Sequence, residues 1–229
     1  MSAAPHRGLA TPRAGLGVAI FDLDGTITWH DTLVPYLWAV LQAHPARLLH
    51  LWRAPWVLLR YAGDRDRGRL KGACIRTVMA GLTRTEVAAV TRAFLDQRLG
   101  TLCRRTALSA IEAHRAEGDH LVLLSASPDL YVLEIGRRLG FDDTLCTGIR
   151  WDGEYLEGAL ATENRHGPEK ARCVAALRGE HPGAGFAAYG NAQSDFAHLL
   201  AVDAPLVVNP SARTRRRAAA LGLATADWS

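Results

Sequence analysis

The feature that most constrains this sequence is a short apolar run that ends in a pair of carboxylates. Residues 18–21 read Val-Ala-Ile-Phe, and Asp-Leu-Asp-Gly-Thr follows at once at residues 22–26. A continuous apolar run of this length predicts a strand buried on both faces of a parallel sheet. Open α/β sheets carry their sites at the carboxyl ends of such strands. We therefore expect Asp22 and Asp24 to lie at a functional edge of a sheet.

Three later segments repeat this pattern of an apolar run followed by small or polar residues. They lie at residues 120–124, 185–189 and 205–208, and helical periodicity lies between them at residues 107–117, 131–139 and 169–177. The alternation predicts an α/β fold, a Rossmann-like doubly wound parallel sheet with helices on both faces.

About a hundred residues separate the first two predicted strands, far more than one crossover helix requires. Helical periodicity recurs in this stretch at residues 33–41, 46–59, 70–80 and 85–99, with a polar loop at 63–68. We therefore predict a small α-helical cap inserted after the first strand. The expected division is a flexible tail at residues 1–17, a core at 18–30 and 105–229, and a cap at 31–104.

Composition favours a folded cytoplasmic protein that does not bind nucleic acid. Of the 229 residues, 48% are hydrophobic and 22% are charged, as in a typical globular domain. The formal net charge of +4 comes from dispersed arginines, and no stacking aromatics interleave them as a single-strand groove requires. Residues 1–17 lack the apolar segment of a secretory signal. Four cysteines without zinc-type spacing indicate a reduced interior: Cys74, Cys103, Cys146 and Cys173. No feature specifies an oligomeric state.

The spacing of Asp22 and Asp24 favours a metal site over a plain turn. Two carboxylates one residue apart repel each other, and keeping both ionised requires a cation or a protonated partner. A hard divalent cation would meet this need through oxygen ligands. The structural alternative is an Asx-rich turn without any ligand.

The polar motifs, taken in order, resemble those of the haloacid dehalogenase (HAD) superfamily of phosphatases. Residues 21–26 match its first motif, Ser125 its hydroxyl motif, Lys170 its basic motif and residues 190–195 its acidic motif. Residues 125–128, 147–158 and 207–210 are similar to the phosphoserine-phosphatase-like branch, subfamily IB. In that branch a helical cap falls between the first two motifs, where the insert is predicted here.

The resemblance implies a role for each motif residue. Asp22 would attack phosphorus to form an aspartyl-phosphate, while Asp24 would protonate the departing alcohol and then activate water. Lys170 would supply positive charge to the phosphate and the nucleophile. The other phosphate contacts would come from Ser125, Ala126, Gly25 and Thr26.

The resemblance also implies a Mg²⁺ ion as cofactor. Its ligands would be Asp22, the backbone carbonyl of Asp24, Asp195 and Asn191. Many relatives have Gly-Asp where this chain has Gly190-Asn191, so a neutral amide replaces a carboxylate. We expect reduced metal affinity from this replacement.

The predicted cap is rich in tryptophan and arginine. Trp38, Trp52 and Trp56 could contact a membrane surface or a lipid tail, but we expect them to form the core of the cap, because small helical modules need large side chains. Arginines at positions 47, 53 and 60 interrupt the apolar stretch, so a membrane-spanning helix is not expected. Lys71 and Arg76 are candidates for contacts with other charges of a substrate.

These features predict a Mg²⁺-dependent phosphomonoesterase that acts on a small phosphorylated metabolite such as phosphoserine. One alternative is a lipid-phosphate phosphatase with peripheral membrane contact through the tryptophan-rich cap. Another is a catalytically silent module that binds a phosphorylated ligand, which Asn191 motivates.

Overall fold

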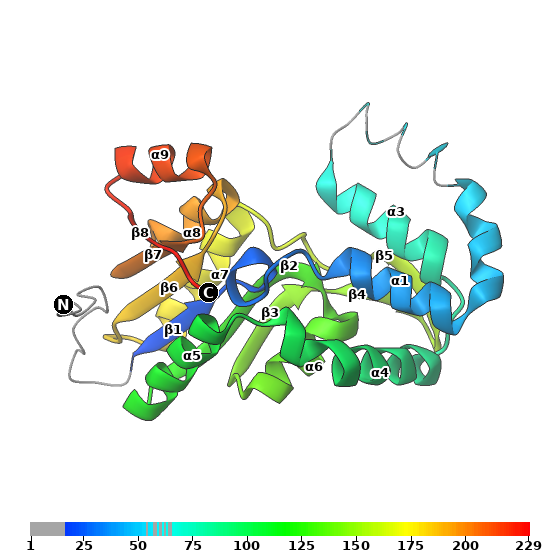
Figure 1. Cartoon of the computed structure of the whole chain (residues 1–229), viewed down its shortest axis with the longest axis horizontal. Helices are drawn as coiled ribbons and strands as arrows, with labels where there is room; N and C mark the ends of the chain where they lie inside the picture. The colour runs from blue at the N-terminus through cyan, green and yellow to red at the C-terminus, as the bar shows by residue number, and fades with distance from the viewer. Residues whose placement is uncertain (1–16, 54, 57–58, 60, 62, 64–65) are drawn as a thin grey trace, which may run out of the picture.

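A sheet of six parallel strands organises the computed structural model, which describes residues 17–53, 55–56, 59, 61, 63 and 66–229 (Figure 1). The strand order is β3-β2-β1-β6-β7-β8, and every neighbouring pair is parallel. The predicted tail lies outside the described residues except for Gly17. The strands are β1 Val18–Phe21, β2 His120–Pro128, β3 Asp143–Thr147, β6 Phe186–Gly190, β7 Ala204–Val208 and β8 Ala224–Ala226.

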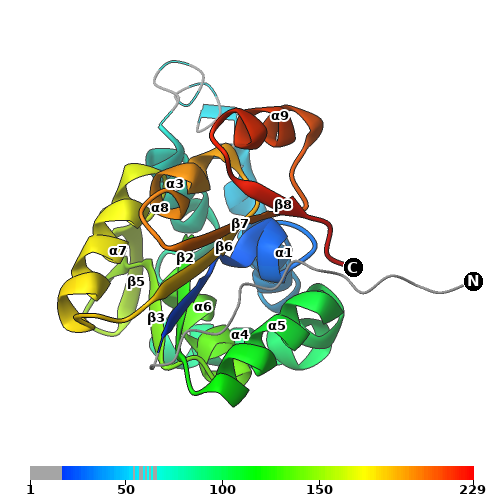
Figure 2. The same ribbon diagram turned by 90° about the vertical axis from the view of Figure 1, so that its left-hand side faces the viewer.

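Side chains of β1 alternate between two apolar cores, one on each face of the sheet. Ala19 and Phe21 pack with α5 (Arg105–Glu117) and α6 (Asp129–Leu139). Val18 and Ile20 pack with α7, α8 and α9, which span Pro168–Glu180, Phe196–Leu199 and Ala212–Ala220. Figure 2 shows α5 and α7 on opposite sides of the sheet. The predicted doubly wound α/β fold is confirmed, and Asp22 follows a strand that is buried on both faces.

The predicted strands and core helices are present with somewhat different ends. Strand β2 continues to Pro128, so that Ser125 lies within it and not after it. Strands β3 and β8 were not expected. Both are edge strands, and neither contains an uninterrupted apolar run.

The predicted cap helices also form, with one change of helix type. The helices are α1 Leu33–Ala43, α3 Arg67–Met79 and α4 Arg84–Leu102, and Pro45–Arg53 is a 3₁₀ helix where an α-helix was expected. The predicted polar loop ends earlier than expected, because its residues 67–68 already belong to α3. Asp66 caps this helix, and its side chain accepts hydrogen bonds from Gly68 N and Arg69 N. Most of residues 54–65 lie outside the described part of the chain. Within the described residues, no helix is long and apolar enough to cross a membrane.

The expectation that the tryptophans form the core of the cap is wrong. Trp38 is 56% exposed, and Trp52 and Trp56 are each 65% exposed. The ring of Tyr36 fills the interior instead, with its centroid 5.5 Å from that of Phe94 and 4.5 Å from that of Tyr131. Trp38 lies two positions after Tyr36 on α1, so it points away from the face that Tyr36 buries.

A two-stranded hairpin from the second half of the chain packs against the cap. Strands β4 (Ile149–Asp152) and β5 (Tyr155–Leu160) are antiparallel and lie beside α3. The contact is close, because a Cβ atom on Gly158 would lie 2.7 Å from Cα of Arg76. Backbone hydrogen bonds also join Leu156 to Gly81 and to Leu82. We propose a division of core and cap at residues 30/31 and 104/105, with this hairpin as an outlying part of the cap.

The chain connects core and cap through two pairs of adjacent segments. In the first pair, Thr28 and Cys103 form a β-bridge, and Trp29 N donates to Leu102 O at 3.0 Å. In the second pair, Ala161 N donates to Gly148 O at 2.8 Å. Each connection is therefore double-stranded.

Candidate active site

Asp22 lies where β1 ends and the chain turns back on itself. The next residues, Leu23–Ile27, form one wide turn that is closed by a hydrogen bond from Thr28 N to Leu23 O, and within it Gly25 has a φ of +81°. This left-handed conformation favours glycine. The turn brings Thr26 back beside the strand end, where its hydroxyl donates to Oδ2 of Asp22 at 2.9 Å. One carboxylate oxygen of Asp22 is thereby fixed.

Lys170 fixes the other carboxylate oxygen of Asp22 and also binds Asp195. Helix α7 starts at Pro168, where proline is favoured because its missing N–H has no helical partner. In its first turn Lys170 is only 2% exposed. Its Nζ donates to Oδ1 of Asp22 at 2.6 Å and to Oδ1 of Asp195 at 2.8 Å. Three residues that are far apart in the sequence therefore meet in one buried cluster.

The turn after β6 holds Asp195 and places Asn191 beside the first motif. Oδ2 of Asp195 accepts hydrogen bonds from the backbone N–H groups of Asn191 and Ala192 at 3.1 and 2.9 Å. A Cβ atom on Gly25 would lie 1.9 Å from Nδ2 of Asn191. Asn191 therefore lies directly against the turn that follows Asp22.

Asp24 is held by a set of hydroxyl groups that the sequence did not single out. Its Oδ1 accepts from the backbone N–H and the hydroxyl of Thr32, both at 2.7 Å. Its Oδ2 accepts from the hydroxyl of Ser127 at 2.6 Å. Thr32 in turn lies 2.9 Å from the hydroxyl of Tyr131. Ser127 could have been found from its place two residues after Ser125 in β2, whereas Thr32 and Tyr131 carry no sequence signal.

Ser125 and Ala126 lie in β2 next to a lysine from the cap. Ser125 is fully buried, and its Oγ accepts from the backbone N–H of Ser127 at 3.0 Å. Nζ of Lys71, on α3, donates to the carbonyl of Ala126 and, at 2.8 Å, to Oδ1 of Asn164. The structure thus brings Lys71 to the site, whereas Arg76 forms an ion pair with Glu157 of the hairpin at 3.5 Å.

Burial and charge change the protonation behaviour of the two motif aspartates. Burial raises the pKa of Asp22 to about 7, although the positive charge of Lys170 opposes the shift. Burial also raises the pKa of Asp24, with a further contribution from the negative charge of Asp31. Asp24 is therefore more readily protonated than an exposed aspartate.

The other three charged groups of the site are shifted as well. At Asp195 the cost of burial is outweighed by Lys170, and the pKa is lowered. At Lys170 the cost of burial is outweighed by Asp22 and Asp195, and the pKa is raised. Burial lowers the pKa of Lys71 to about 8, despite the nearby charges of Asp24 and Asp31. At neutral pH both lysines are therefore mainly protonated.

The donor atoms of this cluster suit a hard divalent cation. Carboxylate oxygens of Asp22 and Asp195 and the side-chain amide of Asn191 are ligand types that Mg²⁺ accepts. Elsewhere in the described residues, His114, Glu117 and Asp119 lie close enough together to be considered for a metal. However, both ring nitrogens of His114 are already within hydrogen-bonding distance of Asp119 and Tyr189.

Comparison with known proteins identifies the family. The sequence model of haloacid dehalogenase-like hydrolases matches residues 19–199, which include all four motifs. This chain belongs to that family. The HAD fold and the predicted phosphoserine-phosphatase-like architecture are thereby confirmed, and the chain is a hydrolase with relatives named as phosphatases.

Curated relatives match along most of their length. The protein CicA of Caulobacter vibrioides is 33% identical over 186 residues, which cover 80% of this chain and 82% of CicA. A probable phosphatase of Mycobacterium tuberculosis is 27% identical over 227 residues, which cover 97% of this chain and 78% of that protein.

Solved structures share the fold. A protein of unknown function from Bordetella pertussis has a TM-score of 0.77 at 22% identity, with 93% of this chain and 98% of that chain covered. A phosphoserine phosphatase in its apo form has a TM-score of 0.61 at 13% identity, with 89% and 91% covered. At these identities the similarity establishes the fold alone.

Proposed function

We propose that this HAD protein is a Mg²⁺-dependent phosphomonoester hydrolase that works through an aspartyl-phosphate on Asp22. The observation that carries the proposal is the buried position of Asp22, with one oxygen bound by Lys170 and the other by Thr26. A carboxylate held in this way is oriented for attack, and attack by a fixed nucleophile divides hydrolysis into two easier displacements.

In the first displacement, Asp22 forms a bond to phosphorus as the bond from phosphorus to the alcohol oxygen breaks. Asp24 gives its proton to the departing alcohol, a role that its raised pKa supports. The Ser125 hydroxyl, together with backbone N–H groups of Ala126, Gly25 and Thr26, would bind phosphoryl oxygens. Lys170 would balance their charge.

In the second displacement, water cleaves the aspartyl-phosphate. Asp24, now ionised, accepts a proton from that water while the water oxygen bonds to phosphorus. The bond between phosphorus and Asp22 breaks, which releases inorganic phosphate and regenerates the carboxylate. Thr32 and Ser127 hold the carboxylate of Asp24 in place for both proton transfers.

Asp22, Asp195, the backbone carbonyl of Asp24 and Asn191 would hold the Mg²⁺ ion. When bound, the ion would neutralise negative charge on the transferring phosphoryl group. When both carboxylates are ionised, Asp22, Asp195 and Lys170 together carry one net negative charge. This excess supports the binding of a cation at the cluster.

The proposed substrate is a small phosphorylated metabolite, for example phosphoserine. Lys71 supports this choice, because its ammonium lies next to Ala126 and the residue is half-buried, which suits contact with a second anionic group of the substrate. A phosphorylated lipid is the alternative substrate class. A panel of phosphorylated metabolites and lipids, compared by kcat/KM, would distinguish the two.

Phosphate release from an aryl phosphate, with and without Mg²⁺, tests the proposed chemistry. Asp22→Asn should lower Mg²⁺-dependent turnover by at least about 10⁴-fold, because the nucleophile is lost. Asp96→Asn is the matched control, since Asp96 lies exposed on α4 and pairs only with Arg138 in the described contacts. Phosphate binding by the wild type without turnover would replace the proposal with a binding module.

A further inference from the structure

Large apolar side chains are exposed together at the end of the cap. Figure 1 shows the 3₁₀ helix Pro45–Arg53 at the edge of the cap that lies away from the six-stranded sheet. Leu49 is 76% exposed, and Trp52 and Trp56 are each 65% exposed. We call the following six residues the cap apolar surface: Leu48, Leu49, Leu51, Trp52, Trp56 and Leu59.

The sequence around the cap apolar surface carries only positive formal charge. Residues 32–63 contain no aspartate or glutamate, and their charged residues are arginines at positions 47, 53 and 60. Arg53 directly follows Trp52 in the sequence. Arg47 has a structural role, because its guanidinium donates to the carbonyls of Val78 and Ala80 at 3.1 and 2.8 Å and ties the 3₁₀ helix to the end of α3. The exposed leucines are thereby held in a defined position.

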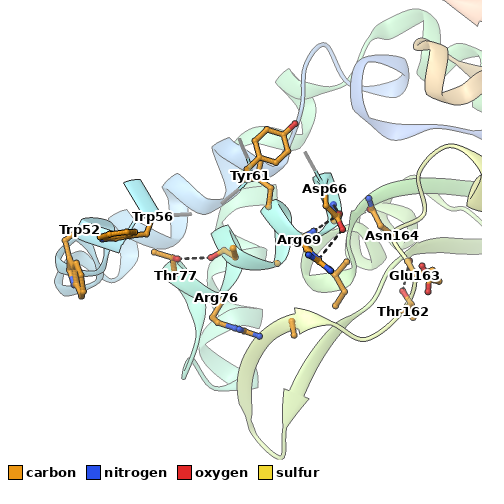
Figure 3. A pocket seen from close by; sticks show the side chains of 16 residues that line it. Trp52, Trp56, Tyr61, Asp66, Arg69, Arg76, Thr77, Thr162, Glu163 and Asn164 are labelled. Atoms are coloured by element: carbon orange, nitrogen blue, oxygen red, sulfur yellow. Dashed lines mark hydrogen bonds and ion pairs between the residues drawn. The ribbon is translucent and has the colours of Figure 1, made fainter. Parts of the chain in front are cut away.

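Two of the exposed tryptophans line a pocket of the cap. It has a volume of about 810 Å³ and is walled by α3 and β5. Trp52 and Trp56 stand at one end of it, whereas Asp66, Glu163 and Asn164 lie toward the other end (Figure 3). The indole rings therefore border an open space and do not fill the cap interior.

We propose that the cap apolar surface binds the interfacial layer of a bilayer that contains anionic lipid. Indole rings sit favourably at the level of lipid headgroups, and leucines beside them enter the boundary with the acyl chains. Arginines in a segment whose sequence contains no aspartate or glutamate are attracted by the negative surface potential of such a bilayer. This charge complementarity favours an anionic bilayer over a neutral one. The proposal concerns where the protein is held, and it is independent of the proposed catalytic chemistry.

Flotation with vesicles tests this proposal on the full chain. The wild type should float with vesicles of phosphatidylcholine mixed with phosphatidylglycerol, and much less with vesicles of phosphatidylcholine alone. Trp52→Ser combined with Trp56→Ser should lower the partition coefficient by about tenfold or more, because both exposed indoles are removed. Arg53→Glu should weaken binding to the anionic vesicles selectively, and so should salt near 1 M, which reduces the Debye length to about 3 Å.

Leu133→Ser is the matched control. Leu133 is 51% exposed and lies on α6, outside the cap, so its replacement should not affect flotation. Thermal unfolding of every variant checks that the fold is retained. The proposal is overturned if the wild type stays at the bottom with both kinds of vesicle. It is also overturned if the tryptophan variants float as well as the wild type. A concentration-dependent dimer in sedimentation without vesicle binding would assign the surface to a second copy of the chain instead.

Discussion

Nζ of Lys170 lies 2.6 Å from Oδ1 of Asp22, and this contact joins the first turn of α7 to the end of β1. The same ammonium lies 2.8 Å from Asp195, so one buried cation compensates two buried carboxylates. Because burial makes each unpaired charge costly, the three groups depend on one another for stability as well as for the proposed chemistry.

Removing the lysine should therefore destabilise the protein strongly. Lys170→Met leaves Asp22 and Asp195 without their buried partner, and we expect a loss of about 3–5 kcal/mol in the free energy of unfolding at neutral pH. Urea denaturation followed by circular dichroism measures this loss. Arg172→Met on the same helix is the control, because Arg172 is 75% exposed and its pair with Glu169 contributes about 0–1 kcal/mol. Equal losses for the two variants would contradict the interpretation.

The pKa of Asp22 predicts how activity depends on pH and Mg²⁺. With its pKa raised to about 7 by burial, Asp22 is largely protonated in mildly acidic solution and cannot act as a nucleophile there. We expect kcat/KM to rise through this pH range at low Mg²⁺. The acid limb should move to lower pH as Mg²⁺ is increased, because the cation stabilises the ionised carboxylate. Rates measured against pH at several Mg²⁺ concentrations test this, and an acid limb that does not move would contradict it.

The same pKa shift predicts a pH dependence of stability. The folded protein keeps a proton on Asp22 up to about pH 7, whereas the unfolded chain loses it near the ordinary value of 3.8. Between these values the folded state binds more protons, so the contribution of Asp22 lowers stability as the pH rises. Without Mg²⁺, the free energy of unfolding of the wild type minus that of Asp22→Asn should therefore decrease as the pH rises from 4 to 7. A difference that is constant from pH 4 to 7 would refute it.

Gly25 should tolerate no side chain. In Gly25→Ala the new Cβ would lie 1.9 Å from Nδ2 of Asn191 and would occupy a backbone conformation with a φ of +81°. We expect lower activity and a stability loss of about 2–5 kcal/mol, from the unfavourable φ and the steric overlap together. Gly81→Ala separates the two effects, because Gly81 has a φ of +80° but no atom within 4 Å of the added Cβ. Thermal unfolding and phosphate release should show a stability loss of only about 1–2 kcal/mol and normal activity for Gly81→Ala.

Restoring a carboxylate at position 191 should strengthen Mg²⁺ binding. Asn191 lies against the turn that follows Asp22, and Asn191→Asp adds a charged oxygen ligand there. Because cation affinity rises with the number of charged ligands, we expect the Mg²⁺ dissociation constant to fall on the order of tenfold. Isothermal titration calorimetry measures this constant. Gln193→Glu is the control, because it adds the same negative charge two residues later and should change the Mg²⁺ dissociation constant little. An equal increase in Mg²⁺ affinity for both variants would show that the added negative charge, and not a new ligand, is responsible.

The central part of the fold could be predicted from local sequence. Residues 18–21 form a continuous apolar run, which identifies a strand that is buried on both faces, and the carboxylates follow it directly. Strand β3 could not be predicted in this way, because Asp143–Thr147 mixes polar and apolar residues at the edge of the sheet. This segment becomes a strand because it pairs with β2, a contact between residues that are distant in the sequence.

Contacts between distant residues account for what the sequence could not predict at the site. Asp22, Lys170 and Asp195 were expected together because they occur in ordered motifs. Thr32 is bound to Asp24 only because α1 begins at this edge of the sheet. For the tryptophans the prediction from sequence was wrong. Their size and hydrophobicity suggested burial, whereas their positions in the cap leave them exposed.

The two double-stranded connections between core and cap restrict how the cap can move. One lies at Thr28 and Cys103, and the other lies where Gly148 pairs with Ala161. Because cap and core are joined at these two separate places, any motion of the cap that leaves both pairings intact is limited to a rotation about the line between them. Such a rotation would change the contact between Lys71 of the cap and Ala126 of the core, whereas Asp22, Lys170 and Asp195 all belong to the core and would stay together.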